Sequence, residues 1–377
     1  MSRGTARKSR TEIEEPDRLE GFSAPREVDG LIGHDAARSE FKEALNSGRL
    51  HHAWLLVGPE GVGKATFAYH LAREMLALGD DARGHLAPVS TIASENPVFR
   101  KVAARSHPNL LLLRRSWVEK TKRYSQWIGV DEVRRLRAFL GHSAGEGGWR
   151  VVVVDRADDL NQNAANALLK ALEEPPQKTL FLLVAAAEGQ IPVTIRSRCR
   201  TLRVTALPAE DLERAVRAAL ARDDHDIEAE TLLTALELSQ GSVRRALELA
   251  TGDGIALYRD IVAALGKLPE LDGPALHKLA ERLGGAADSE RFELFFSLLL
   301  GLLERLIRIG ATGEDGIGAE GKLASRFLDR SNLSPWVEVW EAIGLAKTDV
   351  TSLNLDRSVL VLETFLRLQR VARANPV

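Results

Sequence analysis

Residues 58–66 constrain the possible folds more than any other part of this sequence, because they read GPEGVGKAT. The apolar run before them, at 53–57, has the composition of a buried strand, and residues 67–76 after them are typical of a helix. A glycine-rich turn between a strand and a helix is the context in which the pattern G-x-x-x-x-G-K-[ST] binds phosphate. The glycines let backbone N–H groups curl around a phosphate, while the helix N-terminus and the lysine add positive charge. The stretch therefore predicts an α/β domain with a cradle for nucleotide phosphates.

The loop departs from the pattern at its last position. There the pattern has a serine or threonine whose hydroxyl ligates Mg²⁺, and this chain has Ala65. Thr66 comes one residue later, about 100° further round a helix. The usual magnesium ligand is therefore missing, which leaves open whether the chain hydrolyses a nucleotide, binds one or only keeps the fold. The loop residues that we expect to contact a nucleotide are Gly58, Gly61, Gly63, Lys64 and Thr66.

Length and composition limit the remaining possibilities. A chain of 377 residues predicts two or three domains, and a formal net charge of −2 provides no overall basic field for nucleic acid. The single cysteine excludes a disulfide framework and a four-cysteine zinc site, so we expect no zinc and a reducing, cytoplasmic environment. No apolar run is long enough to cross a bilayer, so we expect no membrane association. Residues 1–26 are polar and charged, and we expect a disordered tail rather than a signal peptide.

Hydrophobic patterns divide the rest of the chain into an α/β part and a helical part. Within residues 27–205, apolar runs alternate with helix-like segments, which predicts a doubly wound α/β domain with a parallel sheet. The run that ends at Asp155 is the clearest, because continuous β-branched residues suit a central strand buried on both faces. The expected strands cover residues 53–57, 110–113, 150–155 and 179–185, and residues 117–127 are expected to form a surface hairpin or loop.

No strand is expected after residue 208, where the patterns become helical. Residues 206–254 predict a small helical domain and residues 255–377 a second one. The helix expected over 292–309 is the most apolar. The helices of residues 256–377 are apolar on more than one face, and we expect one face to fill the domain core and another to meet neighbouring subunits. The side chains that carry this expectation are Phe292, Leu294, Phe295, Phe296, Leu298, Leu299, Leu302 and Leu303.

The acidic residue at the end of the clearest strand also points to nucleotide chemistry. In phosphate-loop proteins such an acid holds Mg²⁺, often through water, so we expect Asp155 to lie close to a bound nucleotide or metal. A strand-terminal aspartate is unremarkable by itself, and the expectation depends on its pairing with the loop at 58–66. The residue that follows it is Arg156.

Two further motifs carry a resemblance to a known family. Residues 162–176 read QNAANALLKALEEPP, and residues 195–200 read IRSRCR. By composition alone, the first would be an alanine-rich helix stopped by prolines and the second a solvated, arginine-rich edge. Their literal strings closely resemble the bacterial clamp-loader subunits of DNA polymerase III, which are AAA+ proteins. The resemblance covers nearly the whole chain after residue 30 and is strongest over residues 50–75 and 150–205.

The resemblance implies roles for individual residues. It implies that Arg198 is an arginine finger, which reaches into the ATP site of a neighbouring subunit and stabilises phosphate charge there. Residues 241–247 (GSVRRAL) resemble a sensor helix, which implies that Arg244 contacts the nucleotide. The resemblance also implies an AAA+ α/β domain, with residues 206–254 as its lid and residues 255–377 as an oligomerisation collar.

The departures from the family pattern resemble its delta-prime branch. The gamma/tau ATPases carry a complete Gly-Lys-Thr, an Asp-Glu pair, a polar sensor residue and a four-cysteine zinc module. This chain instead has Ala65, Arg156 and an alanine run at 185–187, with Cys199 as its only cysteine. Loss of the hydrolytic groups with retention of the Ser-Arg-Cys motif implies a subunit that does not hydrolyse ATP itself.

The function implied is that of a delta-prime-type subunit of the DNA polymerase III holoenzyme, a nucleotidyltransferase complex, which supports ATP-dependent loading of the sliding clamp onto primed DNA. The implied partners are the gamma/tau and delta subunits, the sliding clamp and, through the complex, primer–template DNA. The chain's own loop would bind ATP weakly or not at all, with Mg²⁺ only alongside a nucleotide. One alternative is an active AAA+ ATPase of the gamma/tau type. Another is an unrelated phosphate-loop kinase, which would need neither the Ser-Arg-Cys motif nor two helical domains.

Overall fold

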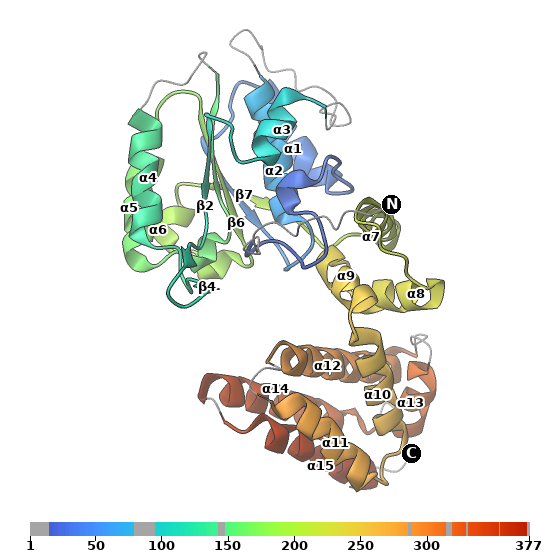
Figure 1. Cartoon of the computed structure of the whole chain (residues 1–377). Coiled ribbons are helices and arrows are strands. Elements are labelled where there is room, and N and C mark those ends of the chain that lie inside the picture. The colour runs from blue at the N-terminus through green and yellow to red at the C-terminus, as the bar shows by residue number, and fades with distance from the viewer. Residues whose placement is uncertain are drawn as a thin grey trace, which may run out of the picture. The chain divides into compact units, whose positions relative to one another are not determined.

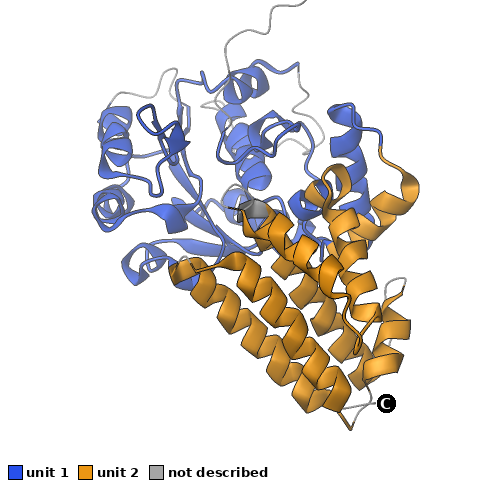
Figure 2. Ribbon diagram, turned by 60° about the horizontal axis from the view of Figure 1, so that its bottom comes forward, with its two compact units in different colours: residues 1–226, 239–247 blue, residues 227–238, 248–377 orange. Residues whose placement is uncertain are grey.

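The chain divides into two compact units, which Figure 2 colours separately. The structure is a computed structural model that describes residues 15–78, 95–141, 148–285, 289–313, 319–328, 331–353 and 355–374. Unit 1 comprises residues 1–226 and 239–247, and unit 2 comprises residues 227–238 and 248–377. Because the two units share residues 206–254, the division at 27–205, 206–254 and 255–377 stays a prediction.

Unit 1 is built on a five-stranded parallel sheet (Figure 1). All residues of β1 (Ala53–Val57) and β6 (Thr179–Ala185), two of its three inner strands, are buried, as expected of strands covered on both faces. The remaining strands of the sheet are β2 (Leu110–Leu113), β5 (Arg150–Val154) and β7 (Arg200–Arg203), in the spatial order β2-β5-β6-β1-β7. The predicted α/β fold with a parallel sheet is thereby confirmed.

Helices cover both faces of this sheet. Side chains alternate along β1, so Trp54 and Leu56 pack against α1 and α2, while Leu55 and Val57 pack on the opposite face against α4 and α5 (Figure 1). The helices of unit 1 are α1 (Asp35–Asn46), α2 (Lys64–Ala77), α3 (Pro97–Ala103), α4 (Val130–Gly141), α5 (Gln162–Glu173), α6 (Val193–Arg196) and α7 (Ala209–Arg222), with 3-10 turns η1 (Pro25–Glu27), η4 (Ala157–Asp159) and η5 (Glu188–Gln190).

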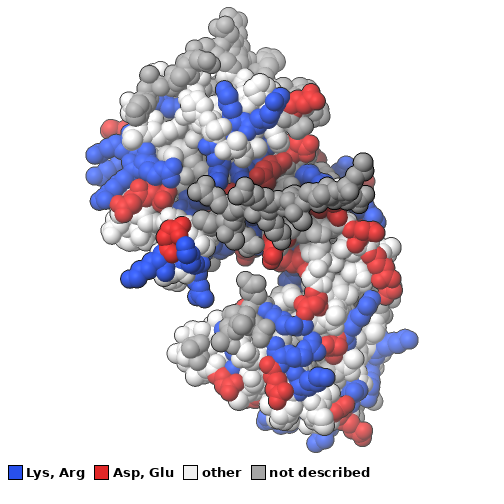
Figure 3. All heavy atoms as spheres, in the orientation of Figure 1, with Lys and Arg blue, Asp and Glu red and all other residues white. Residues whose placement is uncertain are grey.

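Residues 117–127 contain the predicted surface hairpin. Its strands β3 (Trp117–Val118) and β4 (Arg123–Tyr124) pair antiparallel, and the rings of Trp117 and Tyr124 meet edge to face with centroids 5.3 Å apart. The sequence does not predict strand β7, because its two exposed arginines leave Leu202 as its only buried residue, which is too short an apolar pattern to indicate a strand. Acidic and basic side chains are interspersed on the face that Figure 3 shows, in keeping with the formal net charge of −2.

Residues 15–26 differ from the predicted disordered tail, because they pack against unit 1. Phe22 is 3% exposed, and its ring stacks on that of His225 with centroids 4.5 Å apart. The carboxylate of Glu15 lies among guanidinium groups. Those within ion-pair distance belong to Arg26, Arg105 and Arg114. Residues 1–14 lie outside the described residues.

Unit 2 is helical, as predicted for this part of the chain. Its helices are α8 (Ala229–Leu238), α10 (Gly254–Gly266), α11 (Gly273–Gly284), α12 (Ser289–Thr312), α13 (Glu320–Phe327), α14 (Leu333–Leu353) and α15 (Arg357–Ala374), and α9 (Val243–Thr251) passes from unit 1 into it. None of the helices in the described ranges combines the length and the apolar character that a bilayer crossing requires.

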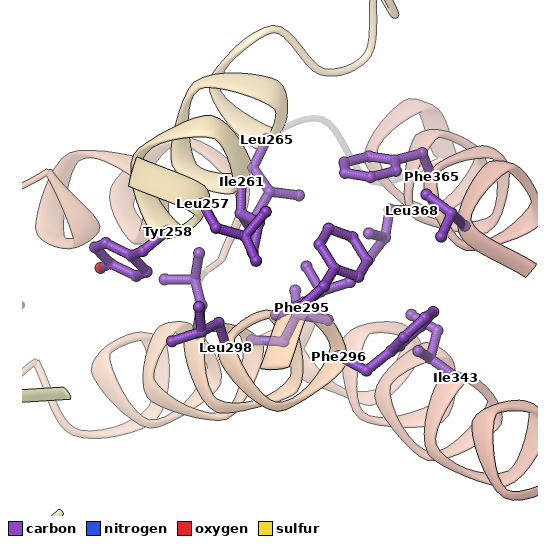
Figure 4. Packing of buried hydrophobic residues seen from close by; sticks show 14 of the residues in the cluster. Leu257, Tyr258, Ile261, Leu265, Phe295, Phe296, Leu298, Ile343, Phe365 and Leu368 are labelled. Atoms are coloured by element: carbon purple, nitrogen blue, oxygen red, sulfur yellow. The ribbon is translucent and has the colours of Figure 1, made fainter. Parts of the chain in front are cut away.

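The core of unit 2 surrounds α12 (Figure 4). Here the structure corrects part of the prediction, because the apolar side chains named for α12 fill the core of the unit itself. The side chains at issue are at most 1% exposed, apart from the partly buried Leu294. These side chains are covered from several sides, because α12 contacts α10, α11, α13 and α14. The exposed large apolar side chains near the C-terminus are Leu345, Leu353, Leu355, Val359 and Leu366.

Candidate functional site

The phosphate loop joins β1 directly to α2, as the sequence predicts. Gly61 and Gly63 have φ angles of 76° and 104°, a backbone conformation that favours glycine. A Cβ atom on Gly61 would also lie 2.3 Å from Oγ of Ser242, which is closer than real Cβ atoms come. The glycines are therefore required by the path of the loop, and that path leaves backbone N–H groups at the N-terminus of α2 for an anion.

The lysine of the loop is buried and folded back over it. Nζ of Lys64 donates hydrogen bonds to the carbonyl oxygens of Gly58 and Pro59, at 2.7 Å and 2.6 Å. Within the described part of the chain no carboxylate oxygen lies within 4.0 Å of this ammonium group. Burial lowers the pKa of Lys64. A buried ammonium without an acidic partner would be stabilised by an anion in the loop.

A cavity of about 400 Å³ adjoins this loop. Such a volume lies in the range of small-molecule sites, which is about 300–1,000 Å³. The structure brings six of the predicted nucleotide residues together in the cavity wall. They are Gly61, Gly63, Lys64, Thr66, Asp155 and Arg244. Gly58 does not line the cavity, but its carbonyl group holds the lysine.

The start of α9 is tied to the phosphate loop. Oγ of Ser242 donates a hydrogen bond to the carbonyl oxygen of Glu60 at 3.0 Å. The backbone N–H of Arg244 donates one to the carbonyl oxygen of Gly61 at 3.1 Å. Both bonds lie within unit 1, which includes residues 239–247. The predicted sensor residue is thus held beside the loop by its own backbone.

Arg156 also lines the cavity, next to the strand-terminal Asp155. Its backbone has φ 60° and ψ 65°, a left-handed conformation that is uncommon for arginine. Its Nη1 lies 3.2 Å from Oε1 of Glu60 in the phosphate loop, and its Nε lies 3.5 Å from Oδ2 of Asp159. The turn therefore directs the guanidinium toward the loop.

Arg198 lies away from the cavity, in the turn between α6 and β7. Its Nη1 donates a hydrogen bond to the carbonyl oxygen of Thr194 at 2.9 Å, and its Nη2 lies 2.8 Å from Oε1 of Glu173. The side chain is 36% exposed. An arginine in this position cannot serve the chain's own cavity but is accessible to another molecule.

Comparison with known proteins places this geometry in a family. The DNA polymerase III subunit delta' of Pseudomonas aeruginosa is 33% identical to this chain over 84% of it and 90% of that protein. The chain belongs to the DNA polymerase III delta' family. The delta' subunit of Escherichia coli is 31% identical over 90% of this chain and 96% of its own length. The subunit tau of Escherichia coli is 27% identical over 76% of this chain and 44% of its own length. A family model described as DNA polymerase III, delta subunit matches residues 33–208.

The side chains beside the loop do not fit a magnesium ion. Ala65 has no hydroxyl, and Asp155 is only 6% exposed. Burial, together with the nearby Asp17 carboxylate, raises the pKa of Asp155 to about 7. Mg²⁺ prefers ionised carboxylates in an octahedral arrangement. No group of three His, Cys, Asp or Glu side chains among the described residues could hold a metal ion. The glycine cradle, in contrast, fits a polyphosphate.

Alanines also line the cavity at the end of β6, where the resemblance implies a polar sensor residue. Ala185 and Ala186, at the end of β6, line the wall where the sequence lacks a polar sensor residue. Cys199, beside the exposed arginine, is half-buried, and burial raises the pKa of its thiol to about 12. The thiol therefore stays protonated near neutral pH and is a poor nucleophile.

Sequence reasoning missed two parts of this site. His34 shares the wall, and its Nε2 donates a hydrogen bond to the carbonyl oxygen of Val62 at 2.8 Å. Burial lowers the pKa of this ring, so it is neutral near pH 7. Residues 28–32 form part of the apolar end of the cavity. No local motif indicates that His34 or residues 28–32 belong to the site. The only signal in the sequence is LIGH at 31–34, which predicts where the folded part of the chain begins.

Proposed function

We propose that this chain is the delta-prime-type subunit of a clamp loader and that it supplies Arg198 to ATP bound by a neighbouring gamma/tau subunit. The observation that carries the proposal is the position of this arginine, in a surface turn outside the chain's own cavity. A planar guanidinium can stabilise phosphate charge that develops during transfer. The active site would thus be shared between two subunits.

The chain's own cavity supports a role without hydrolysis. Ala65 removes a hydroxyl ligand, Arg156 follows the strand-terminal acid, and Ala185 ends β6. We propose that Mg-ATP binds there weakly or not at all and that the lone chain does not turn it over. The chain then acts as a rigid member of a ring, whose ATP-dependent form grips the sliding clamp and releases it after hydrolysis elsewhere.

The proposed partners follow from this role. They are the gamma/tau and delta subunits, the sliding clamp and, through the assembled ring, primer–template DNA. A formal net charge of −2 agrees with a ring in which other subunits supply much of the contact with DNA phosphates. We place this function in the bacterial cytoplasm, as part of the DNA polymerase III holoenzyme.

The test replaces Arg198 in the reconstituted loader. Arg198→Ala should lower clamp-stimulated ATP turnover, since arginine fingers contribute about 10³–10⁵ in rate in other systems. The measured loss should be smaller, because other sites in the ring keep their own fingers. Arg198→Lys should restore little, since an ammonium group cannot reproduce the guanidinium fork. Steady-state ATPase and clamp loading are measured after each variant is shown to assemble.

Arg196→Ala serves as the matched control, because Arg196 lies in the same motif and its side chain donates a hydrogen bond to the carbonyl oxygen of Glu188, at 3.5 Å. We expect Arg196→Ala to lower ATP turnover and clamp loading only slightly. If Arg198→Ala loads clamps at the wild-type rate while Arg196→Ala loads them more slowly, the finger is Arg196. If neither variant matters, the subunit acts as a scaffold alone.

The alternative, an active ATPase, is favoured by one observation, which is the retention of Lys64 beside an open cavity. Magnesium-dependent ATP turnover by the isolated chain, abolished in Lys64→Ala, would support this alternative and overturn the proposed lack of hydrolysis.

A further inference from the structure

Arg156 has no role in the function proposed above, although it lies in the wall of the cavity beside the phosphate loop. We propose that this cavity binds the phosphates of a nucleoside di- or triphosphate without Mg²⁺, and that the guanidinium of Arg156 supplies the positive charge which the metal supplies in other phosphate-loop proteins. The proposal concerns the chain's own cavity and does not depend on Arg198 acting in a partner.

The first support is the placement of Arg156. Its ion pair with Glu60 spans from the end of β5 to the phosphate loop, at 3.2 Å. The two side chains are 43% and 69% exposed, so the pair contributes little energy and can open for an anion. A left-handed backbone at a residue other than glycine costs about 1–2 kcal/mol, and such conformations cluster at functional sites.

The second support is the charge balance around the loop. Lys64 is 8% exposed, and its ammonium group is held only by carbonyl oxygens in the described structure. Burial lowers the pKa of this lysine, the carboxylates of Glu60 and Asp158 oppose that shift, and the nearby charge of Arg156 adds to it. Two cations that share one cavity wall would both be stabilised by a polyphosphate, which carries several negative charges.

The third support is the mismatch between the cavity and Mg²⁺. The hydroxyl ligand is replaced by Ala65, and Asp155 is buried beside a second acid, Asp17. A magnesium-nucleotide complex would also bring a divalent cation toward Arg156. The bare polyphosphate has no such conflict, because a guanidinium donates paired hydrogen bonds to phosphate oxygens.

Another part of the cavity wall is suited to a nucleoside rather than to phosphate alone. The wall there is mostly aliphatic and offers a surface for a flat ring. It is formed by Leu31, Ile32, Leu207, Ala215, Ala218 and Ala219. Close by, Nη2 of Arg222 and Oδ1 of Asp29 lie 3.6 Å apart, so the polar groups at this end are paired with each other. Inorganic pyrophosphate would leave this apolar surface unused.

The test measures binding of ADP and ATP to the full-length isolated chain by calorimetry, in excess EDTA and in excess MgCl₂. Binding in EDTA should be as tight as binding with magnesium, or tighter. Arg156→Gln should weaken binding in EDTA by about tenfold, the effect of losing roughly one charge-assisted hydrogen bond. Inorganic pyrophosphate should compete less well than ADP.

Arg115→Gln is the matched control, because Nε of Arg115 also lies 3.3 Å from Oδ2 of Asp159 but this residue does not line the cavity. It should bind nucleotide as the wild type does. Glu60→Gln should tighten binding, since it removes the acidic partner of Arg156 and a negative charge from the loop. Circular dichroism and melting curves verify that each variant is folded.

A double variant tests the same idea in the opposite direction. Ala65→Thr with Arg156→Glu adds a hydroxyl and a carboxylate at the loop, and binding should then become at least about tenfold tighter with magnesium than in EDTA. The proposal is overturned if the wild-type chain binds nucleotide only with magnesium or not at all. It is equally overturned if Arg156→Gln binds as the wild type does, or if pyrophosphate competes as well as ADP. Arg198→Ala should bind normally, so failure here and failure of the proposed finger are distinguishable.

Discussion

Nη2 of Arg198 lies 2.8 Å from Oε1 of Glu173, so the last residue of α5 orients the exposed arginine of the turn before β7. The two residues belong to the two sequence motifs that most resemble clamp loaders. Their side chains are 36% and 49% exposed, which makes the pair weak enough to open. Under the proposed function, Glu173 is a positioning residue, which holds the guanidinium in place until a partner's phosphate competes for it.

The first prediction tests this positioning role. Glu173→Gln in the assembled loader should lower clamp-stimulated ATP turnover by a few-fold, less than Arg198→Ala does, because the arginine keeps its bond to the carbonyl oxygen of Thr194. Melting of the isolated chain should be unchanged, since exposed pairs contribute at most about 1 kcal/mol. The neighbouring, exposed Glu174 supplies the control variant Glu174→Gln. Equal effects of the two glutamine variants would contradict the role.

The second prediction concerns the segment that we expected to be disordered. A chain that begins at Glu15 keeps the ion pairs of that residue and the burial of Phe22, whereas a chain that begins at Glu27 loses both. Burial of a phenylalanine side chain stabilises a fold by about 1.5–3 kcal/mol. The longer truncation should therefore melt at a clearly lower temperature than the shorter one. Equal melting curves would show that residues 15–26 contribute nothing to stability.

The sequence predicted the parts of this fold that depend on local pattern. Continuous apolar runs specify the buried strands β1 and β6, and glycines specify the loop between β1 and α2. Six of the nucleotide residues expected from motifs line one cavity, because the ends of parallel strands meet at one edge of the sheet. Local reasoning succeeds where neighbouring residues in the chain determine the geometry.

The remaining features depend on residues that are remote in sequence. Glu15 is fixed by Arg105 and Arg114, which no pattern in the N-terminal segment could reveal. Likewise, a local pattern cannot show which helices cover the apolar side chains of α12, so it assigns Leu294 and its neighbours in part to an interface. The direction of Arg156 depends on a left-handed turn, which only the folded backbone shows.

The third prediction follows from the burial of Asp155. Its folded-state pKa is about 7, whereas an unperturbed aspartate titrates near about 3.9. Between these values the folded state keeps a proton that the unfolded state has lost, so stability falls as the pH rises through this window. Asp155→Asn cannot ionise and should escape this loss. It should melt at a higher temperature than the wild type at about pH 8 and close to it at about pH 5, as followed by circular dichroism. A stability difference that does not change with pH would contradict the assignment.

The last prediction identifies the surface through which unit 2 joins the ring. Val359 and Leu366 are 56% and 47% exposed and lie seven residues apart, which places them on one face of α15. The core of the unit is filled by α12, so an interface must use side chains such as these. Val359→Ser with Leu366→Ser should weaken assembly with gamma/tau and delta subunits by at least about tenfold, since each buried aliphatic side chain contributes about 1.5–3 kcal/mol. Size-exclusion chromatography at a series of concentrations measures the change.

A matched control separates assembly from folding. Leu233 is 53% exposed on α8, in the same unit but on another helix, and Leu233→Ser should assemble normally. The double variant on α15 should melt as the wild type does, because exposed substitutions usually change stability by less than about 0.5 kcal/mol. Phe365 lies on the same helix but is fully buried. Phe365→Ala should therefore lower the melting temperature, as expected of a core residue. Normal assembly of the double variant would exclude this face of α15, and the other exposed apolar side chains, Leu345 and Leu353 on α14, would then be the next to test.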